Sequence, residues 1–555
     1  MIFFKKAAFF ILVFAGLLWL VTDRHKYNPE FTWRSNLWAD PAGYYVYLPA
    51  LFLYDFDAEK MPAKIDSLCG DGFDIDKTSN KLFTKYTCGV AILQSPFFLT
   101  AHLIEQEQPS NYKGFSGLYQ KVPDMAAAFY GSIALVFLFF FLRFYFDKWL
   151  SAFITAAMFL GTNIYFFTIY GNGGSHIYSF ALFAVFLYLT KAITENNNPK
   201  IIQIILWAFT IAFILLIRPL NLLFLIPAVF IDCSSFTEAW ERIKFFVKPK
   251  FIAIVITAGF LTFLPQFIYW KYLSGNWIYY SYQNETFSYW KSPQLARLLF
   301  SPNNGLLPYN PIYFFIVFAL GTMLFSKAKN GLQMLFTLVA LVYLTASWHA
   351  VAFGCGYGSR NFSEYAALFA LPLGWLFQQA KNHAIFKYLT GILVVFCVMI
   401  NQKAIYSHDR CFWGGDWDYK EYVHQLTRGG YSNTFTLKDG GAFTPEKEYS
   451  ESFYIRQEKY TLSSFRNAKI TANLKLLNTS ADAILVIDIK AKDGSHIEWK
   501  AINLRDYSTT LNAFEKVTFI SPLPWEFNTE ADYQLYIWNS KKDSFVVKDL
   551  EITLR

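Results

Sequence analysis

The stretch Met125-Ala-Ala-Ala-Phe-Tyr-Gly-Ser-Ile-Ala-Leu-Val-Phe-Leu-Phe-Phe-Phe-Leu-Arg143 contains no charged residue before Arg143. As a helix it is long enough to cross a hydrocarbon core, which takes about 17 to 25 apolar residues. Comparable runs recur along the chain as far as Ala404, and none follows it. The sequence therefore predicts a protein that crosses a membrane many times and ends in a segment of different character.

Apolar runs between charged or Gly/Pro-rich breaks predict about eleven spans. The pair at 201-232 is broken only by Arg218 and Pro219, so it forms either two short spans or one kinked helix. The predicted spans lie near 7-22, 125-143, 149-170, 177-193, 201-217, 219-232, 251-270, 311-326, 332-348, 365-379 and 386-403.

The first apolar run follows Lys5 and Lys6, so a cleavable signal peptide is an alternative to a first span. We favour an uncleaved span, because the run ends at Asp23 and Arg24 rather than at a small-residue cleavage site.

The composition excludes an ordinary water-soluble protein. Of the 555 residues, 54% are hydrophobic and 16% charged, whereas soluble domains carry about 25% charged residues. The net charge of +8 comes from basic residues that lie between the apolar runs. These are typical of topology signals, and no nucleic-acid partner is expected.

The basic residues also predict the orientation, because cytoplasmic loops are enriched in Lys and Arg. With the N-terminus inside, the inner connections hold most of them, including Lys148, Arg242, Lys248 and Lys327. An odd number of spans then places the C-terminal segment on the outer side.

Three regions are expected. Residues 1-404 form the transmembrane domain, with a first outer loop at 23-124, and residues 405-452 form a linker with little regular structure. Within the loop, Val90 to Ile104 is predicted to be a helix that lies on the membrane surface or re-enters it. Residues 453-555 alternate with period two and predict an outer antiparallel β-sandwich, with a turn at Asp493-Gly494.

Cysteines and tryptophans leave alternatives open. Cys69 and Cys88 share the first outer loop, and Cys355 and Cys411 are also placed outside, so either pair could bridge or remain free. In the C-terminal domain the side chains of three tryptophans form either a sugar-binding platform or part of the core: Trp499, Trp525 and Trp538.

The most informative motif is Trp38-Ala-Asp-Pro-Ala-Gly-Tyr-Tyr-Val-Tyr, which places Asp40 just outside the first span beside a run of tyrosines. Three further stretches are Lys85-Tyr-Thr-Cys-Gly-Val-Ala-Ile-Leu-Gln-Ser-Pro-Phe-Phe, Leu299-Phe-Ser-Pro-Asn-Asn-Gly-Leu-Leu-Pro and Trp348-His-Ala-Val-Ala-Phe-Gly-Cys-Gly-Tyr-Gly-Ser-Arg-Asn-Phe. In this order they resemble the GT-C superfamily of polyprenyl-phosphate-dependent membrane glycosyltransferases, in particular bacterial mannosyl- and aminoarabinosyl-transferase-like members.

The resemblance covers roughly residues 1 to 403 and implies a role for each matched residue. Asp40 would be the catalytic base, and its alternative role is that of a helix N-cap before Pro41. Lys85 and Arg360, with Arg218 third, would hold the donor phosphate, or would otherwise reach the headgroups or pair with an acid such as Glu364. The other candidate substrate-binding residues are Tyr44, Tyr45, His176, His349 and Tyr357.

The sequence departs from the commoner pattern, because it has one acid at position 40 and Tyr86-Thr87 after Lys85. A divalent metal ion is therefore the one cofactor left open, and no metal ligand is identified.

The resemblance implies an inverting glycosyltransferase in a bacterial inner membrane, with a cytoplasmic N-terminus and a periplasmic C-terminal domain. It would move a sugar from a polyprenyl-phosphate carrier to a glycan, lipid or protein acceptor, in contact with membrane lipid. Two alternatives are a transporter or flippase of lipid-linked saccharides, and a membrane-anchored sugar-binding assembly protein.

Overall fold

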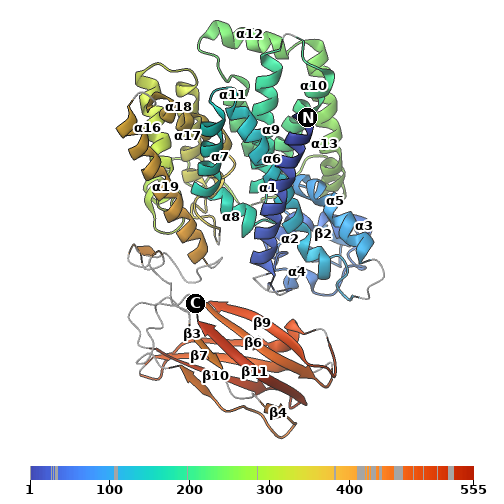
Figure 1. The fold of residues 1–555 in the computed structure, drawn as a ribbon. Helices are drawn as coiled ribbons and strands as arrows, with labels where there is room; N and C mark the ends of the chain where they lie inside the picture. Colours follow the sequence, from blue (N-terminus) through green and yellow to red (C-terminus); the bar gives the residue numbers. More distant parts are fainter. Residues whose placement is uncertain are drawn as a thin grey trace. The chain divides into compact units, whose positions relative to one another are not determined.

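The computed structural model describes residues 2–26, 28, 30–31, 35–105, 110–196, 198–283, 285–354, 356–380, 383–408, 419, 422–423, 426, 433–436, 441–455, 467–478, 481–491, 493–508, 510–522 and 531–554. The chain divides into a helical unit, chiefly Phe31–Tyr406 together with the first helix, and a β-rich unit, chiefly Gly414–Arg555. Figure 1 shows the two kinds of structure.

The helical part opens with the first helix and the compact region that follows it: α1 (Ile2–His25), α2 (Asp40–Tyr45), α3 (Tyr47–Phe52), α4 (Ile65–Leu68), β1 (Asp74–Asp76), β2 (Lys81–Phe83) and α5 (Gly89–Ile104). The remaining helices are η1 (Gly117–Lys121), α6 (Val122–Leu142), α7 (Lys148–Gly161), α8 (Ile164–Ile169), α9 (His176–Thr194), α10 (Ile201–Ile217), η2 (Pro219–Asn221), α11 (Leu222–Val229), α12 (Phe236–Phe246), α13 (Pro249–Ser274), α14 (Leu295–Phe300), α15 (Leu306–Tyr309), α16 (Tyr313–Phe325), α17 (Gly331–Ser347), η3 (Arg360–Phe362), α18 (Ala366–Gln379) and α19 (Ala384–Ser407).

A helix forms at each predicted apolar run, but the count of about eleven spans is not confirmed. Within the described residues, five helices are long and apolar enough to cross a membrane: Ala7–His25, Gly117–Leu142, His176–Thr194, Pro249–Ser274 and Ile385–Tyr406. Others, such as α10 and α17, are apolar but shorter.

The run at 149-170 is not one helix. It breaks between α7 and α8, where Thr162 has an extended backbone and Asn163 donates its backbone N–H to Asn310 Oδ1 at 2.6 Å.

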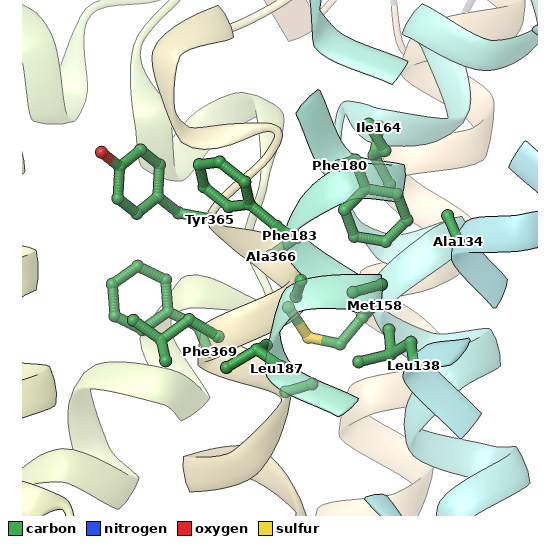
Figure 2. Packing of buried hydrophobic residues seen from close by; sticks show 14 of the residues in the cluster. Ala134, Leu138, Met158, Ile164, Phe180, Phe183, Leu187, Tyr365, Ala366 and Phe369 are labelled. Carbon is green, nitrogen blue, oxygen red and sulfur yellow. The ribbon is translucent and has the colours of Figure 1, made fainter. Parts of the chain in front are cut away.

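Apolar side chains fill the middle of the helical unit. Figure 2 shows Leu138 of α6, Met158 of α7, Phe183 of α9 and Phe369 of α18 gathered at one place. All four are buried. The sequence is apolar around the full circumference of these helices, which is the pattern of helices that are buried or in contact with lipid.

The described residues between α1 and α6, here called the loop region, fold compactly around an apolar core that includes Leu37, Tyr45, Ile65 and Phe98. Figure 1 shows α2 and α4 at one end of the helical unit, and the amphipathic helix α12 at the opposite end. The stretch predicted to lie on or re-enter the membrane is α5, which packs against α6 as well as against α2 and α3.

The β-rich unit contains two antiparallel sheets that enclose one core. Their order is β5-β10-β7-β8 in one sheet and β3-β11-β6-β9 in the other, with β4 also paired to β11. Buried side chains such as Leu485, Ile537 and Ile552 form the core. The elements are β3 (Asn433–Thr436), β4 (Gly441–Phe443), β5 (Phe453–Ile455), β6 (Asn467–Leu476), β7 (Ala483–Ala491), β8 (His496–Asn503), η6 (Leu504–Tyr507), β9 (Glu515–Pro522), β10 (Ala531–Asn539) and β11 (Phe545–Leu554).

The period-two pattern thus predicted the sheet strands correctly, and the turn at Asp493-Gly494 joins β7 to β8, with Gly494 at a φ of +85°. The expected linker at 405-452 is partly structured instead. Its strands β3 and β4 pair with β11. Without them, one edge of β11 would be left without hydrogen-bond partners.

Cys69 and Cys88 are free and buried, so they do not bridge. Cys355, Cys411 and Trp525 lie outside the described residues. Trp499 is 48% exposed, whereas Trp538 is only partly exposed.

Candidate functional site

Asp40 begins the short helix α2 at one end of the helical unit. The N-cap is Ala39, which has a φ of 51° and makes no side-chain capping bond, and Pro41 lies in the first turn. The alternative prediction that Asp40 caps the helix is therefore wrong. Ala39 instead donates its backbone N–H to Cys69 O at 2.7 Å, which fixes the start of α2 against the rest of the loop region.

Both carboxylate oxygens of Asp40 have partners from distant parts of the chain. Tyr86 donates its hydroxyl to Oδ1 at 2.5 Å, and Arg360 donates from Nη1 to Oδ2 at 3.1 Å. The side chain of Asp40 is nevertheless 40% exposed, and that of Arg360 is 28% exposed. The carboxylate is held in one orientation and remains open to a molecule from outside.

The partners also control the charge of Asp40. Burial works to raise the pKa of this carboxyl, but Arg360, the Tyr86 hydroxyl and Lys85 together hold its pKa below the usual value. Burial and the neighbouring carboxylate raise the pKa of Tyr86 well above its usual value, so Tyr86 stays a hydrogen-bond donor.

Lys85 lies beside this pair and contacts a second acid. Its Nζ donates to Glu285 Oε1 at 2.6 Å, and both side chains are about one-third exposed. The ammonium group lies 5.5 Å from the ring centre of Tyr86 and 5.8 Å from that of Tyr282. Ser281 donates its hydroxyl to Lys85 O at 2.6 Å, which fastens the segment before Glu285 to the loop region.

A third cation, Arg218, projects from the break between α10 and η2. It donates from Nη1 to Glu364 Oε1 and from Nη2 to Asn361 Oδ1, each at 2.9 Å. His176 Nδ1 lies 3.0 Å from Glu364 Oε2, and the Glu364 side chain is 1% exposed. The alternative expected for these cations, pairing with an acid such as Glu364, therefore holds for Arg218. Arg360 pairs with Asp40 instead.

Tyr44 joins these groups. Its ring packs against that of Tyr86 with 4.2 Å between centres and a tilt of 33°. Its hydroxyl interacts electrostatically with Arg218, Asp40 and Arg360. The structure therefore brings together the predicted residues Asp40, Lys85, Arg360, Arg218, Tyr44 and His176.

Three predicted residues lie elsewhere. Tyr45 is fully buried and donates to Gly114 O. Tyr357 is also fully buried and donates to Asn401 Oδ1 at 3.0 Å, so its ring is part of the helix packing. His349 is exposed and packs on Trp348, and no described contact connects it to Asp40.

A buried network supports the site from behind. Asp124 at the start of α6 lies 2.6 Å from His25 Nδ1 and accepts hydrogen bonds from Asn36 and Asn172. Asn36 precedes Asp40 by four residues, and Gly173 follows Asn172 and packs so closely on Pro41 that a Cβ would lie 2.5 Å from it. The end of α1 and two loops are thus fixed around α2.

Sequence reasoning missed Tyr86, Glu285 and the Asp124 network. In the sequence Tyr86 stands out only as a departure from the commoner motif, although it follows Lys85 directly. Glu285 is separated from Lys85 by 200 residues, so no local pattern could have paired them.

The residues at Asp40 do not fit a divalent metal ion. Such an ion takes several oxygen or nitrogen ligands, but Asp40 contacts no second carboxylate among the described residues and already binds Tyr86 and Arg360. Lys85 and Arg360 also place positive charge beside it. No cluster of three or more His, Cys, Asp or Glu residues that could hold a metal occurs among the described positions.

The fold and the site define a class: a multi-pass membrane protein with a β-sheet domain and an ion-paired, exposed carboxylate at one end of its helices. No protein-family model matches the chain, and no curated protein matches it. Among solved structures, the apo oligosaccharyltransferase of Archaeoglobus fulgidus is 13% identical with a TM-score of 0.42, and the match covers 75% of this chain and 57% of that one.

The arabinosyltransferase EmbB of Mycobacterium smegmatis is 10% identical with a TM-score of 0.32, over 98% of this chain and 64% of that one. The chain thus spans just over half the length of the archaeal enzyme and somewhat less than two thirds of EmbB. Both are glycosyltransferases by name.

Proposed function

We propose that the chain is a glycosyltransferase that moves a sugar from a polyprenyl-phosphate carrier to a hydroxyl-bearing acceptor on the outer face of the membrane. The observation that carries the proposal is the placement of one exposed carboxylate, Asp40, among three cations, Lys85, Arg218 and Arg360. This set contains a proton acceptor and the charges that a leaving phosphate requires.

In the proposed reaction the acceptor oxygen attacks the anomeric carbon while the bond from that carbon to the phosphate oxygen breaks. Asp40 takes the proton of the acceptor hydroxyl, and the lipid phosphate leaves with the bonding electron pair. Attack from the side opposite the phosphate inverts the anomeric configuration. Lys85 and Arg360 stabilise the negative charge that develops on the leaving phosphate, and Tyr86 keeps the carboxylate oriented.

Tyr44 packs against Tyr86 and His176 contacts Glu364, and we assign both to sugar binding. The β-rich unit is proposed to bind or orient the acceptor. We further propose a bacterial inner membrane as the location, with the N-terminus in the cytoplasm and the β-rich unit in the periplasm.

The test is transfer from radiolabelled polyprenyl-phosphate sugars by the purified full-length chain, with and without a chelator. We expect Asp40→Asn to lower turnover at least about 100-fold, as removal of a general base does, while the protein still folds and loses only the small stability of the partly exposed pair with Arg360. The chelator should have no effect, because the residues at Asp40 do not fit a metal. Unchanged turnover in Asp40→Asn would remove Asp40 from the reaction.

A further inference from the structure

The three cations of the site are each paired with one carboxylate. Lys85 pairs with Glu285, Arg218 with Glu364 and Arg360 with Asp40. A phosphate that enters this site adds negative charge to a cluster in which three carboxylates already neutralise the three cations. One carboxylate must therefore give up its cation, because like charges at close range repel and a partly buried charge without a partner is costly.

Two of the three carboxylates are poorly placed to leave. Glu364 is 1% exposed and is held by both Arg218 and His176. Asp40 is held by both Tyr86 and Arg360. Movement of either would cost two hydrogen bonds, and for Glu364 it would also leave a buried charge without its cation.

Glu285 differs in both respects. Its side chain is 32% exposed, and its carboxylate has Lys85 as its one hydrogen-bond partner among the described residues. The backbone around it is held separately, because Tyr280 donates its hydroxyl to Glu285 O at 2.8 Å and Ser281 donates to Lys85 O. A side-chain rotation alone would move the carboxylate into water and free the ammonium group.

We propose that Glu285 occupies the place of the donor phosphate on Lys85, and that a phosphate monoester or diester binds there by displacing it. Glu285 then weakens the binding of every phosphate ligand by competing for one cation. This inference rests on the proposed function for the identity of the ligand, but its test measures binding and does not depend on turnover.

The test uses the full-length protein in nanodiscs of neutral lipid and measures the Kd of farnesyl phosphate, with farnesol and inorganic phosphate as separate arms. We expect Glu285→Gln to tighten farnesyl phosphate binding about two- to fivefold, the size of a partly exposed ion pair. Farnesol binding should not change. If inorganic phosphate also binds more tightly, the site recognises the phosphate group alone. If only farnesyl phosphate binds more tightly, the lipid chain is required as well.

A double variant separates local competition from a general change of charge. In a Lys85→Met background, Glu285→Gln should no longer tighten binding, because the contested cation is gone. The matched control is Glu241→Gln, which removes the exposed pair with Lys244 on α12 and should leave the Kd unchanged. Equal or weaker binding in Glu285→Gln, or equal tightening without Lys85, would overturn the proposal, whereas loss of turnover in Asp40→Asn bears only on the transfer reaction.

Discussion

Tyr86 orients Asp40 by donating its hydroxyl to Oδ1 of that carboxylate. A hydrogen bond to a charged group is worth about 1.5 to 3 kcal/mol, so Tyr86→Phe should lower kcat about tenfold or more. The fold should be unaffected, because the ring and its contact with Tyr44 remain. Tyr45→Phe is the control, since it removes a buried hydroxyl that bonds to Gly114 O; equal losses of kcat in the two variants would contradict a specific role for Tyr86.

The surroundings of Asp40 also predict how kcat/KM depends on pH. Burial works to raise its pKa, but Arg360, Tyr86 and Lys85 lower it below the ordinary value of 3.8. The folded protein therefore keeps Asp40 ionised as the pH falls to that value, and the stability from its ion pair is lost only at lower pH. We expect no fall in kcat/KM from this residue between about pH 5 and 8.

Removal of Arg360 should shift the pH below which Asp40 becomes protonated. In Arg360→Gln the pKa of Asp40 should rise, because burial then acts with less opposition, and the acid limb of the kcat/KM profile should shift to higher pH. A profile that falls near pH 6.5 in both proteins, without a shift, would point to a group other than Asp40.

At the scale of the element, the close approach of α2 to its neighbours depends on Gly43. A Cβ at this position would overlap Gly72 O and lie 2.5 Å from the ring of Tyr86. Gly43→Ala should therefore push α2 away from Tyr86, lower the free energy of unfolding by about 1 to 3 kcal/mol and reduce turnover at least as much as Tyr86→Phe. Thermal unfolding in detergent and the transfer assay measure the two effects, with Gly16→Ala as control because a Cβ there meets nothing within 4 Å; a fully active Gly43→Ala protein would disprove the dependence.

The elements also show how far the sequence could predict the site. Apolar runs located the helices, and period-two alternation located β7, β10 and β11, because both signals are local. The pairing of Asp40 with Arg360 joins residues 320 positions apart, and only the order of motifs indicated it. The partners Tyr86 and Glu285 could not be predicted, because both lie in segments between helices. The packing of these segments on one another, which no single segment encodes, decides which side chains meet.

At the scale of the whole molecule, the proposed reaction requires Asp40 and the β-rich unit to lie on the outer side, and α12 to lie on the inner side. Two exposed positions can report this: Glu241 on α12, 62% exposed, and Lys541 in the β-rich unit, 55% exposed. On intact spheroplasts, a membrane-impermeant maleimide should label Lys541→Cys more strongly than the parent chain. Glu241→Cys should be labelled only after the membrane is opened. The reverse pattern would place the Asp40 carboxylate on the cytoplasmic side, because α12 and α2 lie at opposite ends of the helical unit (Figure 1). It would thereby exclude sugar transfer on the outer face.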